Sequence, residues 1–559
     1  MPTRQEMWNR LGDPVDLLVI GGGITGAGIA RDAGRRGLKV ALVEMQDLAY
    51  GTSSRSSKLV HGGLRYLEHY EFSLVFESVS ERRILMDIAP HLVNPLGFLF
   101  PVFKGSKRKL WLVETGMWLY DGLSLFRTPK LHRTLDPAQV GEEEPALTTE
   151  GLSGAPLYYD CYTDDARLTL ETALDAAAVG ATVATWAKVV SFVKETTGRV
   201  VGAVVEDGLT GELKEVRAPA VINATGPWTD RTISMSKPLS TGSLLRPTKG
   251  VHIVVERDKL PVNNAVVCFH PTDDRPLFAI PWEECTYIGT TDTDFDDEPG
   301  TEAATLEDVD YLIAAAARYF PDHPIHHDDV LSTWAGLRPL MKPPSVESDI
   351  EESSVSREHQ IIVGRDGLIT IAGGKLTTYR RMAAETVDTA VKLLRLSDQL
   401  PGGVTEPNTD REPLPGAVGW PDDDDHEAVA AQVHKAGGGR IDINTARLLA
   451  NTYGMLSIDI ARMTAKDPEL AVPLVEGRPE VLAQVDWAVR EELAATVSDV
   501  LHRRTQVYFK DPGQGMDAAE QVAARMATLI GWTEAQKAHS LQDYRDDVSL
   551  SCRWREELK

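Results

Sequence analysis

The chain has 559 residues, of which 42% are hydrophobic and 25% charged, and its formal net charge is −25. This composition is typical of a folded globular protein, and the length predicts two or three domains. The negative charge argues against a nucleic-acid partner, because phosphate binding needs a basic face. The four cysteines form no C-x-x-C pair, which predicts neither a zinc site nor a disulfide framework. The polar N-terminus and the lack of an apolar run of about 18 residues predict neither a secretory signal nor a transmembrane helix.

Residues 15–44 predict a strand, a glycine turn, a helix and a second strand. The runs at 16–20 and 38–43 are short and apolar, as in parallel strands that are buried on both faces. A helix is expected from residue 24 to about 36, with its N-terminal amides and partial positive charge directed at a phosphate.

Three glycines and one acid within this unit predict a dinucleotide site. Gly21 permits the tight turn, Gly23 lets the backbone approach a pyrophosphate, and Gly26 allows the helix to pack closely on the strand. Glu44 ends the second strand, where a carboxylate binds the ribose hydroxyls and disfavours a 2′-phosphate. A glycine-rich turn in an ordinary α/β domain would explain the glycines without explaining Glu44. The unit leaves both NAD and FAD open as the cofactor.

The next segment, MQDLAYGTSSRSSKLVHGGLRYLEHYEF, is dense in serine, glycine and cationic residues. Its hydroxyls and amides suit a loop that wraps a cofactor, and a flexible surface loop is the alternative. Apolar residues such as Leu59, Val60 and Leu64 favour the first interpretation. Residues 71–89 then show helical apolar spacing, and Pro90 ends the predicted helix.

Residues 92–130 combine aromatic side chains with concentrated positive charge. This combination is typical of a segment at a membrane surface, with rings at the headgroup boundary and cations on anionic lipid. A core helix with a basic exposed face explains the pattern equally well. The cations are Lys104, Lys107, Arg108, Lys109, Arg127 and Lys130, and the aromatic residues include Trp111 and Trp118.

Residues 158–188 predict a helix between short extended pieces, with Asp164 or Asp165 as its N-cap. The residues that follow alternate strand patterns with glycine turns, as in a β-meander. The last of these strands, at 220–223, runs into the sequence Ala-Thr-Gly at 224–226. That junction resembles the second cofactor contact of flavoproteins with two dinucleotide folds, and it favours FAD over NAD.

Strand-like runs between about 240 and 350, in KGVHIVVE, PLFAIPW and TYIGTTDTD, predict a substrate domain inserted in the cofactor domain. The acidic run that begins at Asp292 fits the first positions of a calcium loop. Asp297 stands where such a loop needs glycine and Ala303 where it needs glutamate, so calcium is excluded and no metal is expected.

After the predicted substrate domain, the sequence predicts a strand at 368–372, a Gly-Gly turn and a helix from Leu376. Residues 398–425 are rich in Pro, Gly and Asp, which predicts a linker. Four consecutive aspartates in this linker are interpreted as solvated charge. From residue 427 the pattern is helical, with a cap before DINTARLLANTYG and a stop at Gly454.

Taken together, these motifs resemble the FAD-dependent, quinone-linked sn-glycerol-3-phosphate dehydrogenases over nearly the whole chain. The strongest blocks are GGGITGAG, TSSRSSKLVHGGLRYLEHYEF, NATGPW, KGVHIVV, IPW with IGTTD, GLRPL and GGKLTTYR. The resemblance implies an α/β fold, α+β overall: a glutathione-reductase-like FAD-binding Rossmann domain, an inserted antiparallel-sheet substrate domain and a C-terminal helical domain. Residues 1–397 would be the oxidoreductase region, with FAD-binding segments at about 14–100, 155–235 and 355–397, substrate-binding segments at about 100–155 and 236–354, a linker at 398–425 and a helical domain at 426–559.

The family's reaction would be oxidation of sn-glycerol 3-phosphate to dihydroxyacetone phosphate, with electrons passed from FAD to membrane quinone. The resemblance further implies a cytoplasmic protein bound peripherally to the inner face of the cell membrane, and it allows a homodimer. An oxidase that uses oxygen is one alternative, although that family typically carries an insertion that this sequence does not show. A flavin amine or amino-acid oxidase would leave the basic cluster unexplained. A flavoprotein-like binding module without turnover is the last alternative.

Such a reaction needs cations for a phosphate dianion and a proton acceptor beside the hydroxyl at carbon 2. Lys375 follows two glycines at a helix start, where a cation is unfavourable unless it serves a ligand. Arg338 lies among apolar residues, where an unpaired charge is costly. The resemblance assigns Arg65, Tyr66, Arg357 and Lys375 to the phosphate, and His252 and Arg338 to the hydroxyl.

The cofactor would be bound by residues from four segments of the chain. These are Gly21, Gly23, Gly26, Glu44, Thr52, Ser53, Ser57, Lys58, His61, Gly62, Gly63, Ala224, Gly226, Gly374, Leu376 and Thr377.

Overall fold

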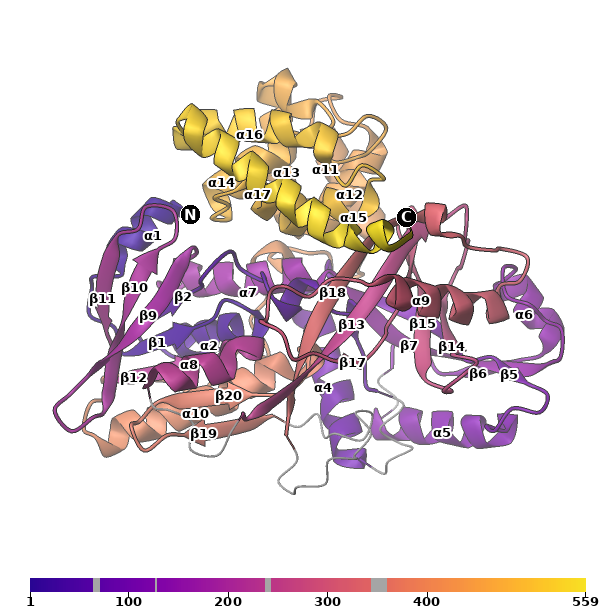
Figure 1. The fold of residues 1–559 in the computed structure, drawn as a ribbon, viewed down its shortest axis with the longest axis horizontal. Coiled ribbons are helices and arrows are strands. Elements are labelled where there is room, and N and C mark those ends of the chain that lie inside the picture. Colours follow the sequence, from indigo (N-terminus) through magenta and orange to yellow (C-terminus); the bar gives the residue numbers. More distant parts are fainter. Residues whose placement is uncertain (64–70, 126–127, 237–242, 343–358, 559) are drawn as a thin grey trace.

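The computed structural model describes residues 1–559 with the exception of 64–70, 126–127, 237–242, 343–358 and 559. Two sheet-based regions lie next to each other, and the helices of the C-terminal region lie across both of them (Figure 1). The predicted combination of an α/β region, a second sheet and a C-terminal helical region is confirmed.

The first region is built on a six-stranded sheet in the order β19-β20-β12-β1-β2-β8. Its strands run parallel except β19, which pairs antiparallel with β20. The predicted strand, helix and strand at 15–44 are confirmed, and every residue of the two strands is buried. The elements are β1 (Leu17–Ile20), α2 (Ile24–Arg35), β2 (Val40–Val43), β8 (Thr182–Ala184), β12 (Ala220–Asn223), β19 (Gln360–Val363) and β20 (Ile369–Ala372).

Both faces of this sheet are covered. Alternate residues of a strand point to opposite faces, so neighbouring residues of β1 pack with different layers. Leu17 and Val19 of β1 pack with helices α2, α7 and α10, whereas Leu18 and Ile20 pack with the predicted β-meander. Asp164 caps α7 by accepting the backbone N–H of Arg167 at 3.0 Å, as expected of one of the two aspartates. The covering elements are α1 (Arg4–Arg10), α7 (Asp165–Ala178), β9 (Ala187–Lys194), β10 (Val200–Asp207), β11 (Leu213–Arg217), α8 (Thr229–Ser236) and α10 (Tyr379–Leu396).

The second region is built on an eleven-stranded sheet, and most of its strands come from the segments that the sequence predicts to bind substrate. Its strands pair antiparallel except β4 and β14, which run parallel. Strands β3 and β4 belong to this sheet although they lie within the segment 14–100 that was expected to bind FAD. The strands are β3 (Leu59–Val60), β4 (Val93–Leu99), β5 (Val102–Phe103), β6 (Arg133–Leu135), β7 (Leu152–Thr163), β13 (Leu245–Glu256), β14 (Ala265–Phe269), β15 (Pro276–Trp282), β16 (Cys285–Gly289), β17 (Thr293–Asp294) and β18 (Val330–Met341).

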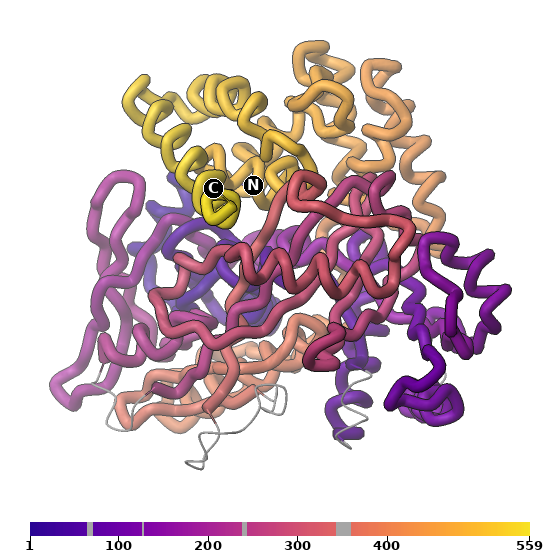
Figure 2. The backbone as a smooth tube through the Cα atoms, turned by 45° about the vertical axis from the view of Figure 1, so that its right-hand side comes forward, coloured from indigo at the N-terminus to yellow at the C-terminus, as the bar shows by residue number. Residues whose placement is uncertain are grey.

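Among the described residues before the linker, four helices accompany the second sheet. The helix predicted over 71–89 is confirmed as α4. Helix α5 lies at the edge of the molecule opposite the C-terminal helices, as Figures 1 and 2 both show. The helices are α4 (Phe72–Ile88), α5 (Leu110–Leu123), α6 (Pro137–Glu143) and α9 (Leu306–Tyr319).

The predicted linker at 398–425 contacts both α2 of the first region and α4 beside the second sheet. Arg31 of α2 donates to the carbonyl oxygens of Thr409 and Glu412, and the backbone N–H of Leu414 donates to Ile88. The helix predicted after Asp442 is confirmed, with Asp442 as its cap and Gly454 at its end. The helices of this region are α11 (His426–Ala436), α12 (Ile443–Tyr453), α13 (Ser457–Lys466), α14 (Ala483–Glu491), a π-helix (Asp499–Arg504), α15 (Val507–Lys510), α16 (Met516–Ile530) and α17 (Glu534–Cys552).

In the part of the chain that the structure describes, no helix is both long and apolar enough to cross a membrane. The same residues contain no cluster of His, Cys, Asp and Glu with the arrangement of a metal site.

Candidate active site

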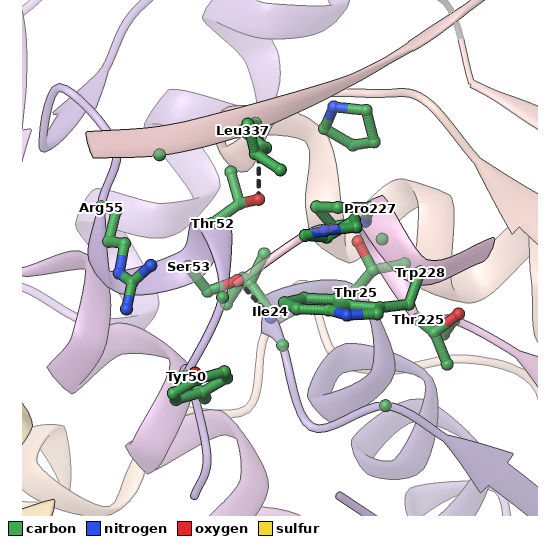
Figure 3. A pocket seen from close by; sticks show the side chains of 18 of the residues that line it. Ile24, Thr25, Tyr50, Thr52, Ser53, Arg55, Thr225, Pro227, Trp228 and Leu337 are labelled. Atoms are coloured by element: carbon green, nitrogen blue, oxygen red, sulfur yellow. Dashed lines mark hydrogen bonds between the residues drawn. The ribbon is translucent and has the colours of Figure 1, made fainter. Parts of the chain in front are cut away.

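A cavity of about 550 Å³ lies between the two sheet regions. The first region contributes the turn between β1 and α2 and the carboxyl ends of β2, β12 and β20, and the second contributes β13 and β18. Figure 3 shows Thr52, Ser53 and Arg55 on one side of this cavity and Thr225, Pro227 and Trp228 on the other. A cleft at the carboxyl ends of parallel strands is where α/β sheets bind ligands.

The three glycines of the predicted motif have different roles. Gly21 has a φ of +109°, and a Cβ there would lie 2.5 Å from the carbonyl oxygen of Ala224. A Cβ at Gly26 would overlap the carbonyl oxygen of Gly21, and Gly26 does not line the cavity. At Gly23 the nearest atom is Ser53 Oγ, 3.1 Å from a Cβ. Gly21 and Gly26 are therefore required by the fold, whereas Gly23 leaves open the space at the N-terminus of α2 where the sequence predicts a pyrophosphate.

Glu44 stands at the end of β2 and lines the cavity. Its carboxylate accepts the backbone N–H of Gly22 at 2.6 Å and that of Gln46 at 3.0 Å. Burial raises the pKa of this carboxyl, and the two N–H groups act against that shift. The carboxylate is thus fixed beside the glycine turn, in the place expected of a ribose ligand.

The serine-rich segment contributes Thr52, Ser53, Ser57 and His61 to the cavity wall. The hydroxyl of Thr52 donates to the carbonyl oxygen of Leu337 on β18 at 2.7 Å, which holds this segment across the two regions (Figure 3). The described residues of this segment between 45 and 61 therefore form part of the cavity wall.

Lys58, Gly62 and Gly63, which were expected to bind the cofactor, do not line the cavity. Lys58 has a φ of +52°, and its ammonium nitrogen lies 2.7 Å from Asp165 of α7. The N–H of Gly62 donates to the hydroxyl of Tyr120 at 2.9 Å. Lys58 therefore contacts α7, and the backbone of Gly62 contacts α5.

The second and third predicted cofactor contacts reach the same cavity. Ala224 and Gly226 line it after β12, and Gly374, Leu376 and Thr377 line it after β20. Thr377 Oγ1 accepts the backbone N–H of His61 at 3.1 Å. Segments separated by more than 300 residues of sequence thus meet around one ligand site.

His252 lies on β13 and lines the cavity, although only 2% of it is exposed to solvent. Its ring stacks on Trp334 with 4.6 Å between centroids, and Nε2 lies 2.9 Å from the hydroxyl of Ser57. Burial lowers the pKa of His252 well below its ordinary value, and the positive charges of Arg338 and Lys58 lower it further. The imidazole is therefore neutral near pH 7 and able to accept a proton.

Arg338 projects from β18 into the same cavity. Nη1 donates to Asp292 at 2.8 Å, and Nη2 donates to the Thr290 hydroxyl at 3.2 Å. Asp292 also pairs with Arg275. Asp292 therefore holds the guanidinium of Arg338 at the wall of the cavity that His252 also lines.

Lys375 also lines the cavity, with its ammonium nitrogen buried, and it precedes the helical turn that leads into α10. Arg65, Tyr66 and Arg357 lie outside the described residues, so their predicted contacts with a phosphate remain predictions. The structure thus brings together three of the six residues assigned to the substrate.

Several cavity residues were not predicted from the sequence. Arg55 pairs with Glu302 at 2.8 Å and lies over the ring of Tyr50 at 5.5 Å. Both Tyr50 and Arg55 belong to the serine-rich segment, and Trp228 ends the block NATGPW. These three therefore lie within motifs from which their position at the cavity could have been predicted. Gly300 had none, because it lies in a loop whose position depends on the second sheet.

Comparisons with known proteins agree on the same protein family over nearly the whole chain. Residues 16–380 match the family described as FAD dependent oxidoreductase, and residues 407–537 match the C-terminal domain of alpha-glycerophosphate oxidase. Glycerol-3-phosphate dehydrogenase 2 of Mycobacterium bovis is 40% identical over 544 residues, which covers 97% of this chain and 89% of the relative. The aerobic glycerol-3-phosphate dehydrogenase of Staphylococcus haemolyticus is 37% identical, with 98% and 97% covered.

A solved structure is also similar over almost the whole chain. The glycerol-3-phosphate dehydrogenase of Bacillus halodurans complexed with FAD has a TM-score of 0.79 and 35% identity, with 98% of this chain and 97% of the other covered. The glycine turn, Glu44 and the enclosing serine-rich segment fit FAD, which is the cofactor of the family. The chain therefore belongs to the FAD-dependent oxidoreductase family and, within it, to the glycerol-3-phosphate dehydrogenases.

Proposed function

We propose that the protein oxidises sn-glycerol 3-phosphate to dihydroxyacetone phosphate with FAD held in this cavity and passes the electrons to a membrane quinone. One observation supports this most strongly: a buried neutral histidine and two cations line the same cavity as the dinucleotide turn. The names of the relatives, which cover nearly the whole chain, support the same substrate.

In this proposal bound FAD supplies the acceptor for the hydride from carbon 2 of the substrate. His252 takes the proton of the hydroxyl at carbon 2, so that the C–O bond becomes a carbonyl as the hydride leaves. The Ser57 hydroxyl, 2.9 Å from Nε2, orients the imidazole, and Arg338 stabilises negative charge that develops on the oxygen. The substrate thereby loses two electrons and two protons.

Lys375 is assigned to the phosphate, together with the predicted contacts of Arg65, Tyr66 and Arg357. A dianion needs several cations, and the strongest contacts come from charge-assisted hydrogen bonds in a site with little water. The burial of the Lys375 ammonium nitrogen supports this assignment.

The substrate test compares glycerol 3-phosphate, glycerol and glycine with a soluble dye as acceptor, and only the phosphate ester should give turnover. Turnover of glycine alone would favour an amino-acid oxidase instead.

Replacing Arg338 or Lys375 with alanine should reduce kcat/KM by about 10- to 100-fold, because a charge-assisted hydrogen bond contributes about 1.5–3 kcal/mol. FAD should stay bound, since Asp292 keeps Arg275 as a partner when Arg338 is lost. Arg246→Ala is the control, because Arg246 pairs with Asp294 on the same sheet but does not line the cavity. Steady-state kinetics and the flavin spectrum give both quantities. Unchanged kcat/KM in both test variants would refute the site.

Oxygen is the second candidate acceptor, because the C-terminal region matches a domain named for alpha-glycerophosphate oxidase. The two acceptors are separated by mixing substrate-reduced protein with either aerated buffer or a soluble quinone in a stopped-flow instrument. We expect the quinone to reoxidise the flavin at the turnover rate and oxygen to do so more slowly. Reoxidation by oxygen at the turnover rate, with one peroxide formed per substrate, would establish the oxidase.

The segment around α5 supports contact with the inner face of the cell membrane. Trp111 and Trp118 expose 66% and 62% of their surface on a helix at the edge of the molecule (Figure 2). Lys104, Lys107 and Lys109 are exposed just before this helix. Aromatic rings and cations together are suited to the boundary of an anionic bilayer.

Changing Lys104, Lys107 and Lys109 together to glutamate should lower the affinity for anionic vesicles by at least about tenfold, because each cation contributes about 1 kcal/mol to binding. Arg108 is left unchanged, since it pairs with Asp274 and lies over the Phe269 ring. The control carries the same charge change at three exposed lysines elsewhere, Lys392, Lys435 and Lys466. Co-sedimentation measures binding, and activity with the dye reports an intact fold. Equal release in test and control would exclude this segment as the anchor.

A further inference from the structure

Residues 45–50, which follow β2, are called the cofactor loop here. They contain a buried aspartate that is held by two arginines of the C-terminal region. Asp47 follows β2, and none of its surface is exposed. Arg503 Nε donates to its carboxylate at 2.5 Å, and Arg504 Nη2 donates at 2.9 Å, with a second contact from Arg504 Nη1. Asp47 and Arg504 are 457 residues apart in sequence, so the C-terminal region reaches directly into the loop.

The loop that contains Asp47 forms part of the cavity wall on both sides of this residue. Glu44 and Gln46 line the cavity before it, and Tyr50 lines it after it. The backbone N–H of Ala49 donates to Gly22 at 3.0 Å, which ties the loop to the glycine turn. A movement of Asp47 would therefore displace both the Glu44 carboxylate and the turn beside it.

The two arginines are themselves held rigidly. They end the π-helix Asp499–Arg504, and π-helical turns are frequent at functional sites. The Asp499 carboxylate accepts from Arg503 Nη2 at 2.9 Å and from Trp186 Nε1 at 3.2 Å, and Arg504 Nη2 also donates to the carbonyl oxygen of Glu492 at 2.6 Å. The cations are thus preorganised for one carboxylate.

We propose that Arg503 and Arg504 are positioning residues for the cofactor, through which the C-terminal region holds the loop at 45–50 in the shape that receives the adenosine half of FAD. A buried carboxylate that loses its partner is strongly unfavourable, so the loop would rearrange to expose Asp47 to water. The cavity wall at Glu44 and Tyr50 would rearrange with it. This inference depends on FAD binding, not on the substrate or the electron acceptor.

The test compares FAD release from the holoprotein of wild type, Arg503→Met and Arg504→Met on dilution, measured by the rise of flavin fluorescence. Methionine keeps an unbranched apolar side chain and removes the charge. We expect the Kd of FAD to rise by at least about tenfold in each variant, as for the loss of one partner of a buried charge pair. Arg504→Lys, which keeps a cation without the planar fork, should give an intermediate Kd.

Two controls separate positioning from general stability. Lys510→Met removes a pair with Glu283 between the C-terminal region and the second sheet, and Arg525→Met removes a pair with Asp486 within the C-terminal region. Both should keep the Kd of FAD within about twofold of wild type, even where the melting temperature falls. If an arginine variant does not fold, Asp47→Asn removes the same charge pair from the side of the loop and should also release FAD.

Hydrogen exchange supplies a readout that a purely structural role would not change. Coupling between two sites is reciprocal, so FAD should slow amide exchange in the π-helix as well as in the loop of the wild-type protein. A Kd in Arg504→Met and Asp47→Asn within about twofold of wild type would overturn the proposal. An equal rise in the Kd of FAD in Arg525→Met would overturn it as well. So would amide exchange in the π-helix at the same rate with and without FAD.

Discussion

Replacing His252 with alanine is expected to lower kcat by about 100-fold or more while the protein keeps its FAD, because a positioned general base contributes about 10²- to 10⁴-fold. The imidazole is buried beside Ser57 and stacked on Trp334, and it has no part in the dinucleotide turn. Measurement of kcat with a dye acceptor, together with the flavin spectrum, tests this expectation.

The matched control is His270→Ala. His270 stacks on Tyr311 and does not line the cavity, so its loss should leave kcat nearly unchanged. A kcat for His252→Ala close to wild type would show that another group accepts the proton.

The pH profile follows from the direction of the pKa shift of His252. Only the neutral imidazole accepts a proton, and burial holds its pKa well below the ordinary value. As pH falls, kcat should therefore remain level through about pH 6.5 and decline only below it. An acid limb centred at or above pH 7 would contradict the role of a buried neutral histidine.

Replacing Gly23 with valine is expected to give a folded protein without bound flavin. A side chain at this position would enter the space beside the N-terminus of α2, where the pyrophosphate is expected, while the nearest protein atom is the hydroxyl of Ser53 at 3.1 Å. Gly21 and Gly26 are less informative, because a Cβ at either would collide with backbone and damage the fold itself.

Visible absorbance of the purified variant measures its flavin content, and circular dichroism reports its fold. Gly402→Val is the control, since a Cβ at Gly402 meets no atom within 4 Å. A Gly23→Val protein that is loaded with flavin like wild type would refute the cofactor assignment.

Local patterns explain which parts of the site could be predicted from sequence. Gly21, Gly23 and Glu44 belong to one continuous unit, whose spacing alone predicts a pyrophosphate beside the glycines and a ribose beside the carboxylate. Lys58 could not be placed in this way, because the backbone at φ +52° and the partner Asp165 on α7 decide where its side chain lies. Sequence position within a cofactor segment does not determine which side chains face the cavity.

Long-range contacts explain most of what the sequence did not reveal. Composition predicted a linker at 398–425, but not that Arg31 of α2 would hold it. In the same way, no sequence pattern near Asp47 predicts an ion pair with Arg504, 457 residues later. The contact of the C-terminal region with the cofactor loop is therefore seen only in the fold. Sequence patterns report periodicity and turns, whereas these contacts depend on the docking of whole regions.

The most direct test of the proposed chemistry is an anaerobic single turnover with glycerol 3-phosphate and with its analogue deuterated at carbon 2. We expect the flavin absorbance to bleach completely with one equivalent of substrate, and to bleach several-fold more slowly with the deuterated compound, because the C–H bond at carbon 2 breaks as the flavin is reduced. A flavin that stays oxidised under excess glycerol 3-phosphate, in holoprotein that is fully loaded, would contradict the account.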